Sequence, residues 1–431
     1  MNIIHFSQAA IISTVSLWLC CSSLGAQVPP PNYDEAKVPK YDLPELLLSL
    51  DGARIETSKD WQEKRRPEIV ELFKTHVYGR APGKPENLKF IVRSIDPNAL
   101  NGTATRKEIT ILFTGQADGP SMDLLIYLPN KSQKPVPAFL GLNFGGNHIV
   151  HNDPGINISP RVRLSRKVDD QAFEKLRGES ASRWQVESVI ARGYAQITAY
   201  YGDLEPDFAE GWKTGIRGYY LKQLSKQTFE EDDWGAISAW AWGLSRAMDY
   251  IEKDSDINAA QVVLHGHSRL GKTALWAGAQ DTRFAIVISN DSGEGGASIS
   301  RRRYGENISN LNRSFPHWFC SNYKKYSDNE GTMPTDQHML IALMAPRPVY
   351  VASAEDDKWA DPRGEFLATK HAEPVYALFG KLGLCVDEMP AVNQPVGNFM
   401  GYHIRTGKHD INAYDWQQYL DFADRHFNRK R

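Results

Sequence analysis

The sequence has few cysteines, no long apolar run beyond its first residues and no excess of basic charge. Four cysteines occur among 431 residues, too few for a disulfide framework in a chain of this size. Lys and Arg number 50 against 52 Asp and Glu, for a formal net charge of −2, so no basic footprint for nucleic acid is indicated. What remains is an ordinary globular composition, 41% hydrophobic, and we expect no nucleic-acid partner.

The first 26 residues have the features of an export signal. A short apolar run over 9–19 leads to Ser23-Leu24-Gly25-Ala26, a small-residue cleavage site before Gln27. The run is shorter than the roughly 20 apolar residues that a membrane-spanning helix needs. We therefore expect a signal peptide over 1–26, a secreted or periplasmic mature chain and no stable membrane insertion. Cys20 raises the alternative of a lipoprotein, but the residue before it, Leu19, is not small.

Removal of this segment leaves Cys320 and Cys385. One bridge between them is possible in an oxidising compartment, and two buried free thiols are the interpretation that we favour. No Cys/His spacing is typical of a zinc site. We expect no metal, no cofactor and a monomeric chain.

Alternating strand-like and helical segments indicate an α/β fold. Two strand-like runs, 108–113 and 122–128, flank a Gly/Asp/Pro turn and predict a hairpin. Beyond that point strands alternate with helices, which predicts a mostly parallel, doubly wound sheet in a three-layer sandwich. The expected strands are 136–144, 194–200, 262–264, 284–288 and 349–352, and the expected helices are 61–77, 185–192, 233–250, 273–279 and 416–427. We expect an N-terminal extension over 27–100 that packs on one catalytic domain over 101–431.

The sharpest motif is a buried strand that runs through Gly266-His267-Ser268-Arg269-Leu270-Gly271 into a helix. This order is typical of the nucleophile elbow of α/β-hydrolases, where a serine sits on a strained turn and small neighbours let strand and helix approach. Here the second glycine lies three residues after the serine instead of two. We predict an α/β-hydrolase fold with Ser268 as nucleophile and Arg269 as oxyanion donor. Gly145-Gly146-Asn147 is a weaker candidate for the wall of the site opposite Arg269.

A base and an acid are expected after Ser268 in the chain, because this fold has the order Ser, Asp or Glu, His. His409 lies in a glycine-containing loop between the presumed last strand and last helix, and we predict it as the base. His403, inside the preceding strand-like run, is expected to be structural. Two strands end next to a suitable acid: Asp357, with Asp356 as a close alternative, follows the strand at 349–352, and Asp291 follows the strand at 284–288. We prefer Asp357, and the sequence leaves both strand ends open.

At these residues the chain resembles the glucuronoyl esterase (4-O-methyl-glucuronoyl methylesterase) family of carbohydrate esterases, particularly its bacterial members. The resemblance runs from about Tyr78 to the C-terminus. It is carried by 266–272, Asn290-Asp291-Ser292-Gly293, Ser300 to Glu306, Phe315 to Phe319, Ala345-Pro346-Arg347-Pro348, Trp359 to Pro362, Gly401 to Arg405, and His409 to Trp416.

The resemblance implies a serine esterase that cleaves esters between glucuronic acid on xylan and lignin alcohols. It implies Ser268 as nucleophile, His409 as base and Arg269 as oxyanion stabiliser, with Lys272, Glu306 and Trp359 holding the uronic sugar. Family members carry the acid after either of two strands. Fungal members have Glu where this chain has Asp291, and Glu294 is a departure to which the sequence assigns no role.

Three alternatives remain at this point. Another carbohydrate esterase, of acetyl xylan or feruloyl type, would use the same machinery. A peptidase of the same fold is disfavoured because no propeller-like repeat accompanies the catalytic region. A non-catalytic sugar-binding relative is disfavoured by the presence of Ser268, His409 and two acids.

Overall fold

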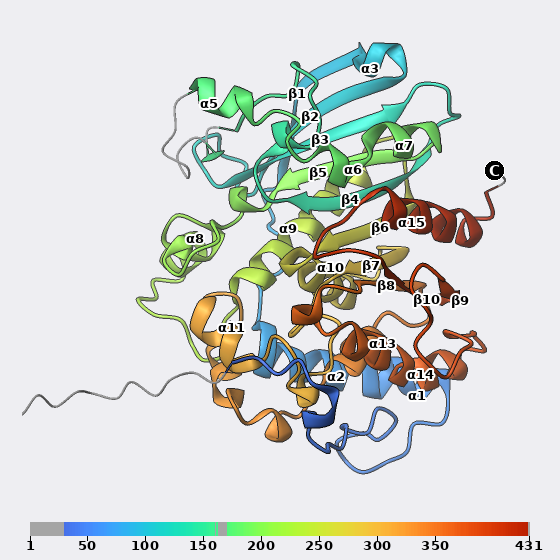
Figure 1. The fold of residues 1–431 in the computed structure, drawn as a ribbon. Helices are drawn as coiled ribbons and strands as arrows, with labels where there is room; N and C mark the ends of the chain where they lie inside the picture. Colours follow the sequence, from blue (N-terminus) through green and yellow to red (C-terminus); the bar gives the residue numbers. More distant parts are fainter. Residues whose placement is uncertain (1–29, 160, 163–169, 430–431) are drawn as a thin grey trace, which may run out of the picture. The chain divides into compact units, whose positions relative to one another are not determined.

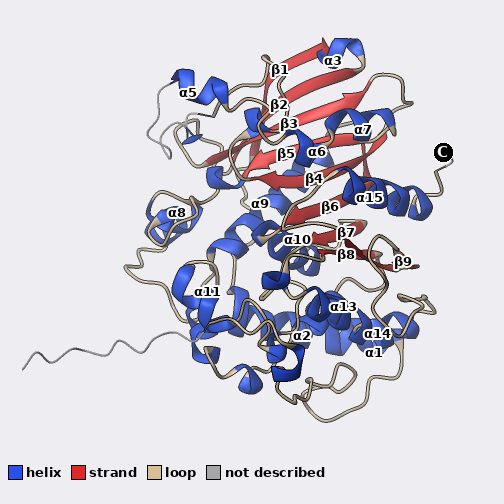
Figure 2. Cartoon of the chain, in the orientation of Figure 1, coloured by secondary structure: helices blue, strands red, loops and turns tan. Residues whose placement is uncertain are grey.

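The computed structural model describes residues 30–159, 161–162 and 170–429, so the predicted signal peptide lies outside the described residues. Pro31–Arg431 form one unit, built on a ten-stranded sheet in the order β1-β2-β3-β5-β4-β6-β7-β8-β10-β9 (Figures 1 and 2). The strands are β1 (Lys89–Asn98), β2 (Ala104–Leu112), β3 (Ser121–Pro129), β4 (Val136–Asn143), β5 (Ala195–Tyr200), β6 (Ile257–His267), β7 (Ile286–Asn290), β8 (Val349–Ala354), β9 (Val396–Gly397) and β10 (Met400–Arg405).

The central strands are parallel. Strand β4 pairs in parallel with β5 and β6, and the parallel order continues through β7, β8 and β10. The predicted hairpin is confirmed as the antiparallel pair β2 and β3. The sequence-based expectations missed β1, which pairs with β2 at the edge of the same sheet.

Helices cover both faces of the sheet (Figure 2). The helices within the described ranges are α1 (Ser58–Asp60), α2 (Arg66–Phe73), α3 (Ala99–Gly102), α5 (Asp170–Lys175), α6 (Ala181–Trp184), α7 (Val186–Ala191), α8 (Ile216–Gln223), α9 (Ala236–Ile251), α10 (Arg269–Gln280), α11 (Ile308–Ser314), α12 (Gln337–Ala342), α13 (Pro362–His371), α14 (Glu373–Leu378) and α15 (Ala413–His426). The expected helix 61–77 is present as α2 between two π-helical turns, Trp61–Arg65 and Lys74–Tyr78.

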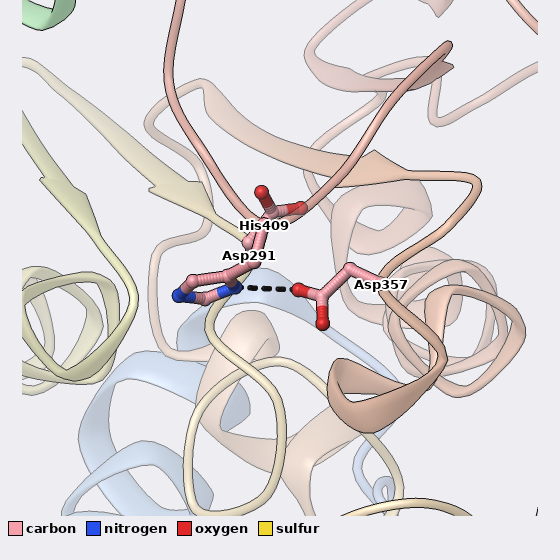
Figure 3. A group of neighbouring side chains, drawn as sticks. All are labelled: Asp291, Asp357 and His409. Atoms are coloured by element: carbon pink, nitrogen blue, oxygen red, sulfur yellow. Dashed lines mark hydrogen bonds and ion pairs between the residues drawn. The ribbon is translucent and has the colours of Figure 1, made fainter.

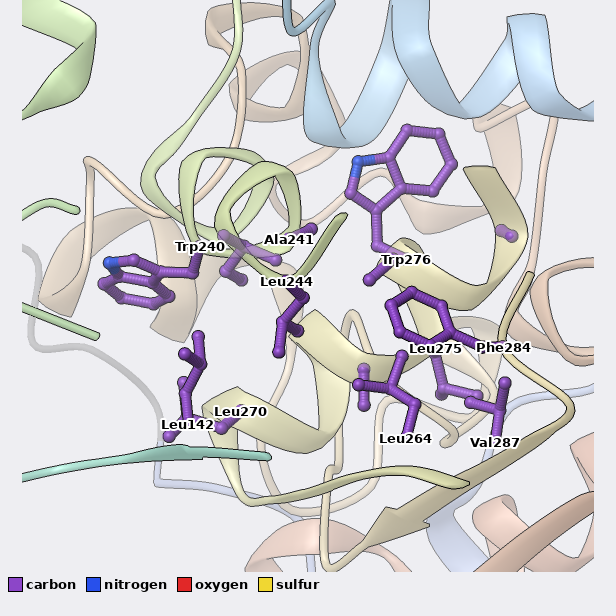
Figure 4. Close-up of a cluster of buried hydrophobic side chains, with 14 of the residues drawn as sticks. Leu142, Trp240, Ala241, Leu244, Leu264, Leu270, Leu275, Trp276, Phe284 and Val287 are labelled. Carbon is purple, nitrogen blue, oxygen red and sulfur yellow. The ribbon is translucent and has the colours of Figure 1, made fainter. Parts of the chain in front are cut away.

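The core divides at the sheet because successive side chains of a strand point to opposite faces. In β6, Leu264 belongs to the large cluster that includes α9 and α10, and its neighbour Val263 belongs to the cluster that includes α15. Figure 4 shows the first cluster, in which Trp240 of α9 and Trp276 of α10 are fully buried. The sheet is thus fixed between two apolar layers, and this fixes the ends of its strands.

Some local expectations differ from the structure. Strand β6 is longer than predicted, and helices α11 to α14 were not predicted because short helices in a loop-rich stretch have weak periodicity. Cys320 and Cys385 are both free, as expected, but Cys385 is exposed, so the prediction that both are buried is wrong for that residue. It lies in the 379–395 stretch, which has no regular strand or helix to bury it. None of the helices in the described ranges is long and apolar enough to cross a bilayer.

Candidate active site

The strand ends bring the predicted site residues to one edge of the sheet. Strands β6, β7, β8 and β10 are parallel neighbours, so their carboxyl ends meet at that edge. Ser268 follows β6, Asp291 follows β7, Asp357 lies just beyond β8, and His409 lies in the loop after β10. Four residues from distant parts of the sequence therefore converge through topology alone.

Ser268 occupies a strained turn between β6 and α10. Its backbone has φ 58° and ψ −130°, a region that non-glycine residues rarely adopt and that is typical of functional turns. A Cβ on Gly266 would lie 1.9 Å from the carbonyl oxygen of Leu270, so only glycine lets strand and helix come this close. A Cβ on Gly271 would lie 3.0 Å from Cβ of Ser292, which leaves little room there either. The extra residue in the elbow is thus accommodated without loss of the sharp turn.

His409 is bonded to Asp357. Its Nδ1 lies 2.6 Å from Oδ2 of Asp357 (Figure 3). Because a carboxylate only accepts, Nδ1 carries the proton and Nε2 is left with a free electron pair, as a base requires. The His409 ring also lies 4.6 Å, centroid to centroid, from the ring of His267, the residue before Ser268. The imidazole therefore stands beside the serine turn.

Asp291 lies in the same cluster without bonding the imidazole. One ligand oxygen of Asp291, one of Asp357 and one ring nitrogen of His409 lie within 4.8 Å of one another. Oδ2 of Asp291 accepts from Nη2 of Arg405 at 3.4 Å and from the backbone N–H of Asp410 at 3.3 Å. Its Oδ1 is buried with no hydrogen-bond partner among the described residues. Burial, with the nearby carboxylate of Glu365, raises the pKa of Asp291 well above its usual range.

Two further buried ionisable side chains, Arg405 and Glu365, hold this edge, and neither was predicted as a site residue. Arg405 donates from Nη1 to the carbonyls of Thr406 and Lys408, both at 3.1 Å, and from Nη2 to the carbonyl of Asp410 at 2.5 Å. It thereby ties down the loop that carries His409. Nε of Arg405 also donates to Oδ2 of Asp415 at 2.8 Å.

Glu365 of α13 is the second. Its Oε1 accepts from the backbone N–H groups of Ser292 and Gly293, at 2.8 and 3.0 Å, and its Oε2 accepts from the hydroxyl of Ser353 at 2.6 Å. Burial raises the pKa of Glu365 to about 8. The contacts join the segment after β7 to the end of β8, so they fix the two acid-bearing ends relative to each other.

Arg269 begins α10 directly after the serine. Its guanidinium carbon lies 4.9 Å from the ring centroid of Trp318, 5.5 Å from that of Phe315 and 5.8 Å from that of Phe144. Guanidinium planes favour such aromatic faces. The rings restrict the cation to one side of the serine turn.

Lys272, Glu306 and Trp359 form a connected group. Nζ of Lys272 donates to Oε2 of Glu306 at 2.9 Å, and Nε1 of Trp359 donates to Oε1 of the same carboxylate at 3.1 Å. Lys272 donates also to the carbonyls of Ser292 and Glu294, at 2.7 and 2.5 Å. All three of its protons are thus used by the protein. Trp359 is 39% exposed, and its indole offers an apolar wall.

Glu294, which the sequence left without a role, is a buried support for this group. Its Oε1 accepts from the hydroxyls of Ser300 and Tyr323, at 2.6 and 2.9 Å. Burial raises the pKa of Glu294 to about 8. The side chain holds the segment whose carbonyl Lys272 contacts.

One cavity of about 370 Å³ is lined by all eight residues singled out in the sequence. Its walls are Ser268, Arg269, Lys272, Asp291, Ser292, Gly293, Glu306, Phe315, Trp318, Asp357, Trp359, Ala360 and His409. The Gly145–Asn147 turn is not part of this wall, and Asn147 lines a different cavity. The cavity combines a strained serine, an imidazole held by an acid, a cation and the polar group formed by Lys272, Glu306 and Trp359. Together these suit acyl transfer from a hydroxylated substrate.

Comparison with known proteins decides the family. The sequence model described as "Glucuronyl esterase, fungi" matches residues 219–380. A protein named "Carbohydrate esterase" from an unknown prokaryotic organism is 50% identical over 421 residues, 96% of each chain. The solved structure of the glucuronoyl esterase from Solibacter usitatus is 53% identical with a TM-score of 0.86, and covers 91% of this chain and 100% of that one. The chain belongs to the glucuronoyl esterase family.

More distant glucuronoyl esterases agree. The enzyme from Teredinibacter turnerae is 34% identical with a TM-score of 0.76 over 89% of each chain. A 4-O-methyl-glucuronoyl methylesterase from Schizophyllum commune is 25% identical over 78% of this chain and 74% of the relative. The resemblance drawn from the motifs is therefore confirmed. The α/β-hydrolase fold and the class of carboxylic ester hydrolase are confirmed with it.

Proposed function

We propose that this chain is a secreted serine esterase that hydrolyses esters of 4-O-methyl-glucuronic or glucuronic acid, such as those linking lignin to glucuronoxylan. The observation that carries the proposal is the single cavity in which Ser268 and the Asp357-bonded His409 face the group formed by Lys272, Glu306 and Trp359. A nucleophile next to this polar group, which we call the sugar-binding group, suits an ester at C6 of a uronic acid.

The proposed reaction has two steps. Nε2 of His409 takes the proton of Ser268 as Oγ attacks the C6 carbonyl, and the oxygen that becomes negative lies toward Arg269. The tetrahedral intermediate expels the alcohol, whose oxygen receives the proton from His409. Water, deprotonated by the same imidazole, then attacks the acyl-enzyme and releases the uronic acid and Ser268. These steps use the chain's own residues.

In this proposal Asp357 is the acid that orients His409, because its carboxylate is the one bonded to the imidazole. Arg269 supplies donors to the oxyanion, a contribution worth about 2.7–4 kcal/mol for a single donor in such sites. Lys272 acts through Glu306, since its protons are already used. Export through the 1–26 segment and a monomeric state belong to the same proposal.

A kinetic panel tests the substrate class. Methyl esters of 4-O-methyl-glucuronate, glucuronate and galacturonate are compared with acetylated xylan and a feruloyl sugar. We expect the highest kcat/KM on a glucuronate ester, because its carbonyl then lies between Ser268 and the sugar-binding group of Lys272, Glu306 and Trp359. Preference for acetyl or feruloyl esters would support the alternative carbohydrate esterases and refute the proposal.

Glu306→Gln is expected to weaken binding of the sugar. A hydrogen bond to a charged group is worth about 1.5–3 kcal/mol, so KM for methyl glucuronate should rise about 10- to 100-fold, with kcat within roughly 3-fold. Steady-state kinetics on that ester measure the effect. An acyl ester without a sugar, p-nitrophenyl acetate, is the control and should be hydrolysed at unchanged kcat/KM. An equal loss on both esters would contradict a sugar-binding role.

A further inference from the structure

Asp207 lies behind Arg269, in the loop between Tyr201–Asp203 and Gly211–Lys213, and belongs to no motif that pointed to the site. Its Oδ2 forms an ion pair with Nη1 of Arg269 and accepts from the hydroxyl of Tyr201 at 3.2 Å. Its Oδ1 accepts from Nε2 of His317 at 2.8 Å and from Nε1 of Trp318 at 2.7 Å. Both carboxylate oxygens are therefore occupied by donors.

This carboxylate is buried and charged. Its side chain is 6% exposed. Burial opposes ionisation of Asp207, but the hydrogen bond from His317 and the charge of Arg269 prevail and lower its pKa to about 2. The ion pair with Arg269 thus persists throughout the neutral range. Removal of water from the pair makes the attraction stronger than at a surface.

Trp318 joins the two charges. Its indole N–H bonds Asp207, and its face lies 4.9 Å from the guanidinium of Arg269. The ring of Phe315 stacks on Trp318 at 3.8 Å with an interplanar angle of 6°, which fixes the platform. The guanidinium is therefore held at its edge by a carboxylate and over its face by aromatic rings. One of its remaining donors, Nε, is buried and has no hydrogen-bond partner among the described residues, so the protein does not use every donor of Arg269.

We propose that Asp207 is a positioning residue that fixes the guanidinium of Arg269 toward the carbonyl attacked by Ser268. A donor that is already oriented needs no reorganisation when the negative charge forms, and this is the source of its effect on rate. A free arginine side chain would lose its rotamer freedom at that moment. The inference rests on the proposed function, because it takes Arg269 as the donor to the oxyanion.

The test is Asp207→Asn, measured on methyl glucuronate alone and combined with Arg269→Ala. The amide keeps an acceptor for His317 and Trp318 and loses the charge that holds Arg269. We expect kcat to fall about 10- to 100-fold, below the roughly 100- to 1000-fold effect of a lost oxyanion donor, with KM within about 3-fold. In the Arg269→Ala background the same substitution should lower kcat by less than about 3-fold, because coupled residues are not additive.

Two further variants keep the inference testable if Asp207→Asn is poorly folded. Asp207→Glu retains the charge on a longer side chain, and its kcat should lie between wild type and Asp207→Asn. Asp249→Asn is the matched control. Asp249 is also buried and ion-paired, with Arg246 at 2.7 Å and Arg283 at 2.8 Å, and does not line the cavity. Its replacement should leave kcat within about 2-fold.

Wild-type kcat in Asp207→Asn, or an equal loss with and without Arg269, would overturn the inference. Either result would leave the proposed esterase intact, because that proposal depends on Ser268. A different result, full activity in a Ser268 variant, would refute the proposed serine esterase. The two failures are therefore separate.

Discussion

Ser268→Ala is expected to lower kcat on methyl glucuronate by roughly 10⁴- to 10⁶-fold, the scale seen when a triad nucleophile is removed. Alanine deletes the attacking oxygen but leaves Arg269 and the sugar-binding group of Lys272, Glu306 and Trp359 in place. Because substrate binding is then unchanged, KM should change by less than about 3-fold. Progress curves with high enzyme concentration and a correction for spontaneous hydrolysis measure the residual rate. Thermal unfolding should be close to wild type, because the backbone strain of Ser268 is set by its neighbours.

Ser289→Ala is the matched control for this loss. Ser289 lies in β7 next to the elbow, is fully buried, and its hydroxyl has no hydrogen-bond partner among the described residues. Its removal should leave kcat within about 3-fold. Comparable turnover by Ser268→Ala and Ser289→Ala would remove Ser268 from the mechanism.

Asp357→Asn is expected to lower kcat by about 10⁴-fold, the effect of presenting the histidine in the wrong tautomer. An amide at this position can donate to Nδ1 of His409, which places the proton on Nε2 and abolishes the base. Asp291→Asn is expected to cost less than about 10-fold. Burial already disfavours the charged form of Asp291, so a neutral amide of similar shape changes little, and Arg405 keeps Asp415 as its partner.

The comparison of these two variants decides which acid serves. Both are measured at the same pH on the same ester, together with thermal unfolding to detect loss of fold. A larger loss in Asp291→Asn than in Asp357→Asn would reverse the assignment. Equal large losses would mean that His409 depends on both carboxylates.

Much of the fold follows from local patterns. The strand–turn–helix order around Ser268 and the alternation of strands with helices predict a parallel sheet, and parallel strands necessarily bring their carboxyl ends together. That is why eight residues from several motifs line one cavity. Strand β1 escaped notice because its side chains alternate weakly between exposed and half-buried positions at the sheet edge, so its apolar pattern is diluted.

The choice between the two acids could not be made from the sequence. Asp291 and Asp357 both lie at the carboxyl ends of neighbouring strands, and the direction of each side chain is not encoded in the sequence. Oδ2 of Asp357 lies 2.6 Å from the imidazole of His409, whereas Oδ2 of Asp291 accepts from Arg405. Asp207 and Glu365 were missed for a related reason. Each acts through contacts between segments that are distant in the sequence, and no spacing in the sequence encodes such contacts. Arg405 lies in the Gly401–Arg405 motif, but only its hydrogen bonds show that it holds the loop of His409.

We propose that Ser268 becomes a nucleophile because the imidazole of His409, which lines the same cavity, takes its proton. The most direct measurement is labelling with a serine-reactive phosphonate followed by mass spectrometry of the intact chain and its peptides. We expect one adduct per chain, on the peptide that contains Ser268, formed rapidly by wild type and at least about 100-fold more slowly by His409→Ala. Labelling of another residue, or equal rates in the two proteins, would contradict it.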